Sequence, residues 1–211
     1  MLKNKDLKTL LNVKAVGFED GYFPPPLKGS KGQYTVLASV FTDNITPVDV
    51  YLTLIEIDGL DATEKALNAL AHFRSEGKLF DVILLGGITY AGFNIIDPMR
   101  LYEIFETPVV VVTQDKPKDE EVEKALKKHF IDWKERLTIL KKFRAKAKIS
   151  KVVKDKTKLY IQPLGIDLPL AQKIIKELIV KGAYPEPLRL AKQIATTLGK
   201  LIFSKYVLEI K

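Results

Sequence analysis

The sequence contains no cysteine and only two histidines, His72 and His129. The absence of cysteine excludes disulfide bonds and thiolate metal sites, and it fits an intracellular protein, so we expect a cytoplasmic location. Two histidines are too few for a histidine-rich zinc site. We also find no serine–histidine–aspartate or cysteine–histidine arrangement for nucleophilic catalysis.

Long apolar runs are missing as well. No run reaches the length that crosses a membrane, and no apolar segment follows the N-terminal residues 1–6, so we expect neither a membrane partner nor a secretory signal. The 211 residues are enough for one good hydrophobic core or two small ones, and we predict one domain over residues 1–211. The formal net charge of +8 favours a polyanionic partner, DNA or RNA.

The stretch from Asp81 to Asp97 organises the predicted fold. Val82 to Leu85 is an unbroken apolar run, which is typical of a strand buried on both faces. Gly86 and Gly87 end the run, and glycine there permits a sharp turn or the close approach of a ligand. Because ligands in open α/β sheets bind beyond the carboxyl ends of the strands, we expect a site at the loop 86–94.

The remaining pattern predicts alternating strands and helices along the chain. The predicted strands are 12–18, 33–41, 48–57, 109–113 and 159–164, and the predicted helices are 62–76, 98–106, 119–130, 168–180 and 185–198. Residues 201–210 fit a strand or a helix equally. Short connections make the first three strands antiparallel, and helical crossovers make the next two parallel. This order predicts an α/β fold with a ribonuclease H-like mixed sheet, three antiparallel strands extended by parallel strands, and helices on both faces.

The run 141–158 differs from the rest of the chain, because it holds nine lysines or arginines and one acid, Asp155. We interpret residues 134–158 as a basic insertion after the last core strand. A nucleic-acid backbone would bind such a run through counterion release. The candidate contacts are Lys141, Lys142, Arg144, Lys146 and Lys148. The alternative is a solvated face or a mobile hairpin arm.

Adjacent carboxylates, Glu19 and Asp20, end the first predicted strand. Neighbours in a strand point to opposite faces, so only one of them faces a given site unless the strand has already ended. Two adjacent carboxylates repel each other, and their proximity is costly unless something offsets it. Asp58, followed by Gly59, also fits a turn, while Asp61 and Asp97 also fit helix caps.

Four segments carry a resemblance to a known family: residues 17–21, 57–63, 86–94 and 185–191. Together they resemble an archaeal family of unknown function, domain of unknown function 99, over nearly the whole chain. That family is similar in fold to endonuclease V, a metal-dependent nuclease that acts at deaminated adenine (inosine). The resemblance implies a ribonuclease H-like fold, and a fold alone does not give an activity.

The endonuclease V motifs can be placed on this sequence one position at a time. The motif Gly-hydrophobic-Asp-x-x-Tyr falls on residues 17–22, so the resemblance implies that Glu19 replaces the catalytic aspartate. The aspartate that follows the buried strand of endonuclease V falls on Gly86, which is the main departure. The region that matches its Gly-His-Arg segment, 182–184, has no histidine. Its middle glutamate has three candidates here, Glu56, Asp58 and Asp61.

These residues suggest an altered metal-nuclease site. Two-metal phosphodiester hydrolysis needs several carboxylates around ions about 4 Å apart, and Gly86 removes one central ligand. A single Mg²⁺ or Mn²⁺ held by Glu19, Asp20 and Asp58 remains as the predicted metal site, with Asp61 added for the catalytic set.

We therefore predict a nucleic-acid-associated protein with a degenerate or altered metal-nuclease site. One alternative is an active magnesium-dependent nuclease on DNA or RNA. Another is a non-catalytic scaffold that binds a protein through residues 89–94. In the nucleic-acid interpretation Tyr90, Phe93 and Asn94 read or stack on a base, whereas the competing interpretation places Phe93 in the core.

Overall fold

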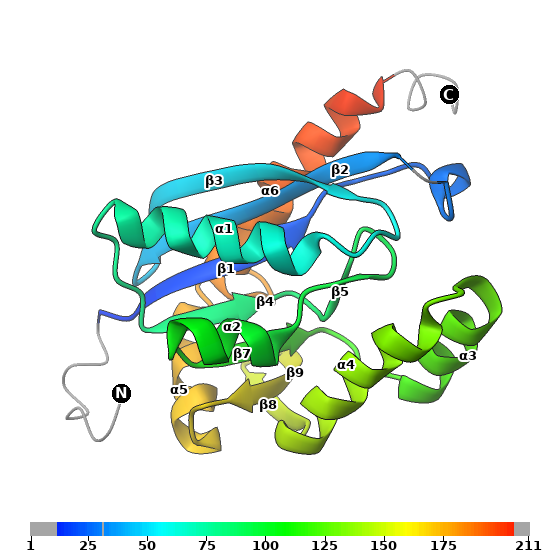
Figure 1. Cartoon of the computed structure of the whole chain (residues 1–211). Helices are drawn as coiled ribbons and strands as arrows, with labels where there is room; N and C mark the ends of the chain where they lie inside the picture. Colours follow the sequence, from blue (N-terminus) through cyan, green and yellow to red (C-terminus); the bar gives the residue numbers. More distant parts are fainter. Residues whose placement is uncertain (1–11, 31, 205–211) are drawn as a thin grey trace.

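A single seven-stranded sheet runs through the computed structural model, which describes residues 12–30 and 32–204 (Figure 1). The strand order is β3-β2-β1-β4-β7-β9-β8, and a small separate ladder joins β5 and β6. The strands are β1 (Lys14–Asp20), β2 (Tyr34–Asp43), β3 (Thr46–Glu56), β4 (Val82–Leu85), β5 (Thr89–Tyr90), β6 (Asn94–Ile95), β7 (Val109–Thr113), β8 (Ser150–Lys154) and β9 (Thr157–Leu164).

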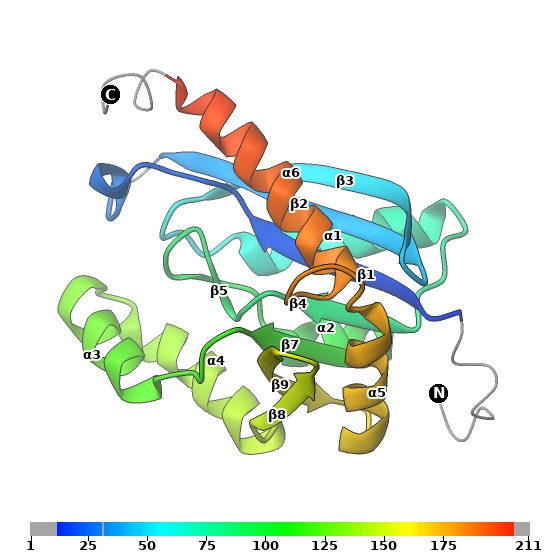
Figure 2. The same ribbon diagram turned by 180° about the vertical axis from the view of Figure 1, so that it is seen from behind.

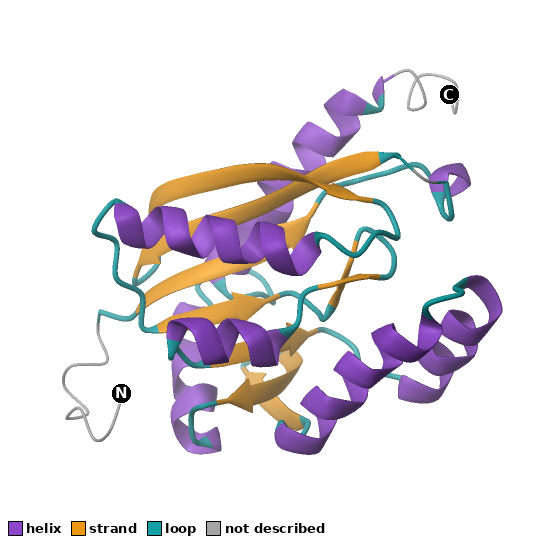
Figure 3. Cartoon of the chain, viewed as in Figure 1, coloured by secondary structure: helices purple, strands orange, loops and turns teal. Residues whose placement is uncertain are grey.

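Helices cover both faces of this sheet. They are α1 (Ala62–Ser75), α2 (Pro98–Phe105), α3 (Asp119–His129), α4 (Trp133–Lys146), α5 (Leu168–Leu178) and α6 (Glu186–Ile202), with a short 3-10 turn, η2, at Pro25–Leu27. Helices α1 and α2 lie on one face, and α5 and α6 lie on the other, as the view from behind shows (Figure 2). Helices α3 and α4 project beyond the sheet on the side where β1 ends (Figure 3).

The strand directions confirm the predicted mixed sheet. Strand β1 pairs antiparallel with β2, and β2 pairs antiparallel with β3. Strands β1, β4 and β7 are parallel, and β9 and β8 then extend the sheet in antiparallel fashion. Every residue of β4 is buried, as its unbroken apolar run predicts.

The region expected to be a basic insertion forms regular structure within the fold. Helix α4 contributes buried Leu137, Leu140 and Phe143 to the main core, and β8 is an edge strand of the sheet. The sequence pattern missed β8 because Val152 is its single buried residue, between lysines that read as a charge run.

The two aspartates expected as helix caps behave differently. The Asp97 carboxylate accepts hydrogen bonds from the backbone N–H groups of Met99 and Arg100, which confirms the cap of α2. Asp61 occupies the N-cap position of α1, but its side chain makes no cap hydrogen bond. The helix-cap interpretation of Asp61 is therefore wrong, because its carboxylate accepts hydrogen bonds from the Glu56 N–H and the Asn94 amide.

Helix α6 lies in backbone contact with β1. A Cβ atom at Gly17 would lie 2.6 Å from the carbonyl carbon of Pro187, and one at Gly21 would lie 2.5 Å from the carbonyl oxygen of Ala195. Only glycine leaves room for so close an approach. The two glycines flank Glu19 and Asp20, so they bring the middle of α6 directly over the end of β1.

The last helix reaches further than the sequence indicated, since α6 includes Leu201 and Ile202. The rest of the ambiguous tail, from residue 205 onward, lies outside the described residues. No helix in the described part of the chain is both long and apolar enough to cross a membrane.

Candidate functional site: a basic groove at the carboxyl ends of the parallel strands

Three clefts join at the carboxyl ends of β1, β4 and β7. The central cleft has a volume of about 490 Å³, and its lining includes Glu19, Gly86, Thr113, Arg144, Tyr184 and Lys192. The β8 cleft has a volume of about 630 Å³ and includes Lys116, Arg144, Lys148, Lys151, Tyr160 and Gln162. The α6 cleft has a volume of about 730 Å³ and includes Gln114, Lys181, Tyr184, Arg189, Lys192 and Gln193.

Shared lining residues show that these three clefts are adjacent. Lys116, Asp119 and Arg144 line both the central and the β8 cleft, whereas Gln114, Tyr184 and Lys192 line both the central and the α6 cleft. We call the whole the basic groove. Lysine and arginine residues line it on both sides of Glu19, and such a groove attracts a polyanion.

Glu19 lies against the floor of the central cleft, with only 5% of its surface exposed. Strands β1 and β4 are parallel neighbours, and Phe18 pairs with Leu85, so Glu19 follows β1 where Gly86 follows β4. A Cβ atom at Gly86 would overlap the carboxylate of Glu19. The missing side chain at Gly86 therefore makes room for the longer acid on the adjacent strand.

The Lys192 ammonium group joins the two acids of β1. Its Nζ lies 3.3 Å from Oε2 of Glu19 and 3.4 Å from Oδ1 of Asp20. The other carboxylate oxygen of Asp20 accepts a 2.7 Å hydrogen bond from the backbone N–H of Ala91. This arrangement offsets the repulsion between the adjacent carboxylates that the sequence left unexplained.

Tyr184 lies on the other side of Glu19. Its hydroxyl is 3.3 Å from the carbonyl oxygen of Gly86 and 3.2 Å from that of Val112, so it ties the ends of β4 and β7 together. The same hydroxyl lies close enough to the Glu19 carboxyl group to lower its pKa.

Burial has the largest effect on the pKa of the Glu19 carboxyl group. Loss of water raises the pKa of its carboxyl group to about 7, although Lys192 acts in the opposite direction and Asp20 adds to the rise. For Lys192, burial lowers the pKa, but the nearby charges of Glu19 and Asp20 outweigh it and leave the pKa raised. The acid thus changes charge near neutral pH while the ammonium group stays charged.

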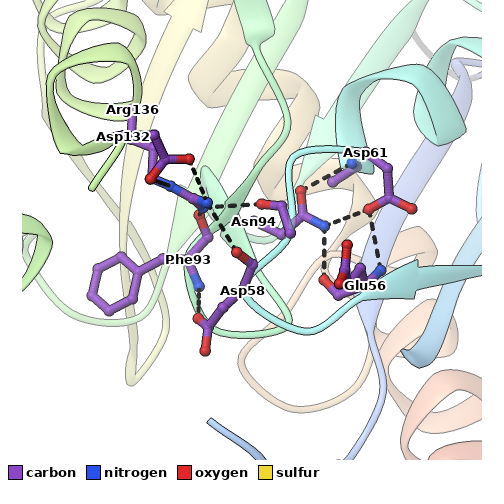
Figure 4. Close-up of polar contacts among 9 residues, drawn as sticks. Glu56, Asp58, Asp61, Phe93, Asn94, Asp132 and Arg136 are labelled. Carbon is purple, nitrogen blue, oxygen red and sulfur yellow. Dashed lines mark hydrogen bonds and ion pairs between the residues drawn. The ribbon is translucent and has the colours of Figure 1, made fainter. Parts of the chain in front are cut away.

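Asp58 and Asp61 belong to a separate network (Figure 4). Oδ1 of Asp58 accepts from the backbone N–H of Phe93 at 2.8 Å, and Oδ2 accepts from that of Gly29 at 2.8 Å. Oδ1 of Asp61 accepts from the backbone N–H of Glu56 and from the Asn94 amide, at 3.1 and 2.6 Å. Neither acid lines the central cleft.

A buried arginine holds the same loops from helix α4. Arg136 is 3% exposed, and its guanidinium donates to the carbonyl oxygens of Asp58, Gly59 and Phe93 at 2.7 to 2.9 Å. It also makes a 2.9 Å ion pair with Asp132 (Figure 4). We call Asp58, Asp61, Asn94 and Arg136 the loop brace. The brace contacts the site only indirectly, since the Asp58 N–H donates to the carbonyl of Ala91, whose own N–H binds Asp20.

Of the three residues expected to read a base, Tyr90 and Asn94 are buried and Phe93 is partly buried. Tyr90 is 1% exposed, and its hydroxyl faces the carbonyl of Phe18. Asn94 is fully buried, and its amide donates to the carbonyl of Glu56 and accepts from the N–H of Ala62. Phe93 packs edge-on against Phe130, with ring centroids 5.4 Å apart. The geometry corrects the stacking interpretation of Tyr90 and Asn94, since buried side chains offer no face to a base.

The predicted basic contacts divide into two sets. Arg144 and Lys148 line the basic groove, whereas Lys141, Lys142 and Lys146 are exposed on α4 and line none of the three clefts. The groove also includes four basic residues that were not among the predicted contacts: Lys116, Lys151, Lys181 and Arg189. Only Lys151 lies within the basic run 141–158.

A divalent ion does not fit the described acids as they stand. No three histidine, aspartate or glutamate side chains in residues 12–30 and 32–204 lie together as a group able to hold a metal. Glu19 and Asp20 form a pair, Gly86 supplies no third carboxylate, and the Lys192 ammonium lies against both acids.

Sequence reasoning missed the two partners of Glu19. Lys192 lies one residue beyond the segment 185–191 that carries the family resemblance, and Tyr184 lies where the histidine of endonuclease V was sought. Lys192 follows buried Leu188 by four positions and precedes buried Ala195 by three, so helical periodicity places it beside the buried face of α6. That periodicity was the one signal available.

Comparisons with known proteins show which family this chain belongs to. A family model described as endonuclease dU matches residues 12–199. A UPF0215 protein of Pyrococcus furiosus is 37% identical over 188 residues, which cover 87% of this chain and 91% of the relative. A UPF0215 protein of Thermococcus kodakarensis is 39% identical over 184 residues, with coverage of 87% and 91%.

Solved structures agree with the fold. A protein of unknown function from Archaeoglobus fulgidus has a TM-score of 0.74 and 28% identity, covering 88% of this chain and 98% of that one. Endonuclease V of Ciona intestinalis, crystallised with DNA that contains an inosine, has a TM-score of 0.62 and 16% identity, with coverage of 90% and 87%. Human endonuclease V has a TM-score of 0.57 and 12% identity, with coverage of 87% and 83%. The ribonuclease H-like fold predicted from strand order is thus confirmed.

Proposed function

This chain belongs to the endonuclease dU family, and from that premise we propose that it is an endonuclease that cleaves a nucleic-acid strand beside Glu19. The single observation that carries the proposal is the basic groove, whose adjacent clefts place lysines and arginines on both sides of Glu19. An endonuclease cleaves within a nucleic-acid strand. A nucleic-acid strand bound along this groove would place an internal phosphate, and not its end, beside Glu19. The family's name directs the choice of substrate to DNA that contains deoxyuridine.

Two buried polar atoms support binding in the groove. In the described part of the chain, Nη1 of Arg144 and Oε1 of Gln162 have no hydrogen-bond partner, and both residues line the β8 cleft. One is a donor and the other an acceptor. A nucleotide offers both kinds of partner, and unpaired buried polar atoms are costly.

The chemistry we propose is hydrolysis with Glu19 as general base. Glu19 takes a proton from a water molecule, whose oxygen forms a bond to phosphorus as the ester P–O bond breaks, and solvent protonates the leaving oxygen. A general base works best with a pKa near the working pH, and burial raises the pKa of Glu19 to about 7. The Mg²⁺ or Mn²⁺ predicted from the endonuclease V resemblance stays a prediction, and adding each ion to the cleavage reaction tests it.

The scaffold alternative receives less support. It relies on residues 89–94 as an exposed loop, yet Tyr90, Asn94 and the backbone around them are engaged within the molecule.

Cleavage of a labelled oligonucleotide with one deoxyuridine tests the function directly. We expect strand scission by the wild type, none with the matching thymidine control, and a loss of at least about a hundredfold in Glu19→Gln, the scale typical of a general base. Circular dichroism verifies that the variant is folded. Equal rates for wild type and Glu19→Gln contradict the assignment of Glu19.

Binding in the groove is tested with two matched triple variants. Lys116→Gln/Lys148→Gln/Lys151→Gln removes three charges that line the groove, and Lys141→Gln/Lys142→Gln/Lys146→Gln removes three that do not. We expect the first variant to weaken fluorescence-anisotropy binding by about tenfold or more and to reduce the salt slope by about two to three. The second variant should stay within about twofold. Equal losses contradict the groove as the binding site.

A further inference from the structure

We propose that the Lys192 ammonium group is a built-in cation of this site, which takes the place between the carboxylates where a metal-dependent nuclease holds its ion. The catalytic role of this cation rests on the proposed function, but the contacts of Lys192 with the two acids do not depend on it. Nζ of Lys192 lies at almost equal distances from Glu19 and Asp20, 3.3 and 3.4 Å. These two acids end β1, and Glu19 lines the central cleft.

The backbone fixes where this cation lies. Contacts at Gly17 and Gly21 hold α6 against β1 through Pro187 and Ala195, and Lys192 falls between those two contact points. The helix cannot withdraw without loss of both contacts. The stem of Lys192 is therefore anchored over the acids even though its side chain is 52% exposed.

The electrostatics of the site favour one cation at this place. A carboxylate as buried as Glu19 is destabilised unless a positive charge lies nearby, and the negative charge of Asp20 beside it adds to that destabilisation. The Lys192 ammonium group supplies that positive charge, because it already contacts both acids. A divalent ion entering the same space would meet a fixed positive charge within a few ångströms and only two carboxylates.

The ammonium group retains one donor for a ligand. It has three N–H bonds, and Glu19 and Asp20 account for two of them. Lys192 also lines both the central and the α6 cleft, so a ligand in either cleft lies within reach of the third N–H. We assign it to a non-bridging oxygen of the phosphate next to Glu19, where it would stabilise the charge that develops as water attacks.

Manganese binding measured by electron paramagnetic resonance tests the inference independently of cleavage. We expect wild-type protein to bind Mn²⁺ only weakly, with an affinity that Glu19→Gln leaves unchanged. Lys192→Met should bind Mn²⁺ about tenfold more tightly than wild type, a difference of about 1.4 kcal/mol. The reason is that the pair of acids then lacks its cation, and the double variant Lys192→Met/Glu19→Gln should lose the gain.

Lys200→Met is the matched control, because it removes an exposed lysine of the same helix that lines none of the three clefts. It should bind Mn²⁺ as the wild type does. The inference is overturned if wild-type protein binds Mn²⁺ and Glu19→Gln abolishes that binding, or if Lys192→Met gains no affinity. A protein that cleaves nothing leaves this result unchanged, so failure of the proposed function and failure of the built-in cation are distinguishable.

Oligonucleotide binding in the presence of a chelator tests the third N–H. Lys192→Met should weaken binding by about tenfold, and Lys192→Arg, which keeps a charge and spare donors, should recover most of it. Equal affinity of wild type and Lys192→Met overturns the phosphate contact.

Discussion

The loop brace and the central cleft both place acids near the carboxyl ends of strands of one sheet, β3 and β1, yet they use them in opposite ways. In the brace, backbone N–H groups occupy both oxygens of Asp58, and Asp61 and Arg136 are engaged with backbone and side-chain partners. In the cleft, Glu19 meets a lysine, a tyrosine hydroxyl and open volume. An acid saturated by its own backbone supports structure, whereas an acid held by side chains at a cleft remains free for a ligand.

Removing Arg136 should have the largest effect and should break the brace. Arg136→Met leaves the carbonyl oxygens of Asp58, Gly59 and Phe93 without their donor and Asp132 without its partner. We expect the free energy of unfolding to fall by about 3–5 kcal/mol, measured by urea denaturation. Arg100→Met, which breaks an exposed pair with Glu64, should cost less than about 1 kcal/mol. A similar loss in both variants contradicts the role of the brace.

The pH dependence of stability should identify the cleft acid. The pKa of Glu19 is about 7 in the folded protein against an ordinary 4.5, so the folded state binds more protons in between. The free energy of unfolding therefore falls as pH rises through this window, by an amount on the order of 3 kcal/mol.

Glu19→Gln removes that decline, so the variant should lose less stability than the wild type between pH 5 and about 8. Denaturation midpoints across this range measure the effect. Glu64→Gln, at a half-exposed glutamate, is the control and should keep the wild-type slope. A Glu19→Gln slope equal to that of wild type rules out the raised pKa.

The packing of Glu19 on Gly86 should be visible as coupling between two substitutions. Gly86→Ala puts a methyl group where the carboxylate lies and should cost about 1–3 kcal/mol of folding stability. Shortening the acid as well, in Glu19→Asp/Gly86→Ala, should recover part of that loss. Gly87→Ala is the control, because its Cβ would meet only the carbonyl oxygen of Thr89, at 3.6 Å. Additive losses in the double variant speak against the contact.

Asp58→Asn should give the smallest effect and should sharpen the division between the two regions. Asparagine tolerates the left-handed backbone of Asp58, where φ is 58°, but it replaces one acceptor oxygen with a donor. We expect a loss of about 1–2 kcal/mol in stability and no change in the cleavage rate of the folded protein. A large fall in rate with unchanged stability would move Asp58 back into the catalytic set.

The sequence by itself determined the order and direction of β1, β2, β3, β4 and β7, because alternation, apolar runs and loop lengths are local patterns, but it missed β8. It also showed that Gly86 could supply no carboxylate and that Glu19 and Asp20 needed an explanation. The sequence could not predict the direction in which each acidic side chain points. Asp58 and Asp61 turn toward backbone donors in loops whose paths depend on helix α4.

Only the tertiary structure decided which cation faces Glu19. Lys192 is 173 positions away, and nothing local marks the two as partners. Their contact follows from helix packing, since Gly17 on β1 and Gly21 directly after it allow α6 to cross above the acids. Periodicity predicts which face of a helix is buried, but where that face lands depends on the whole sheet.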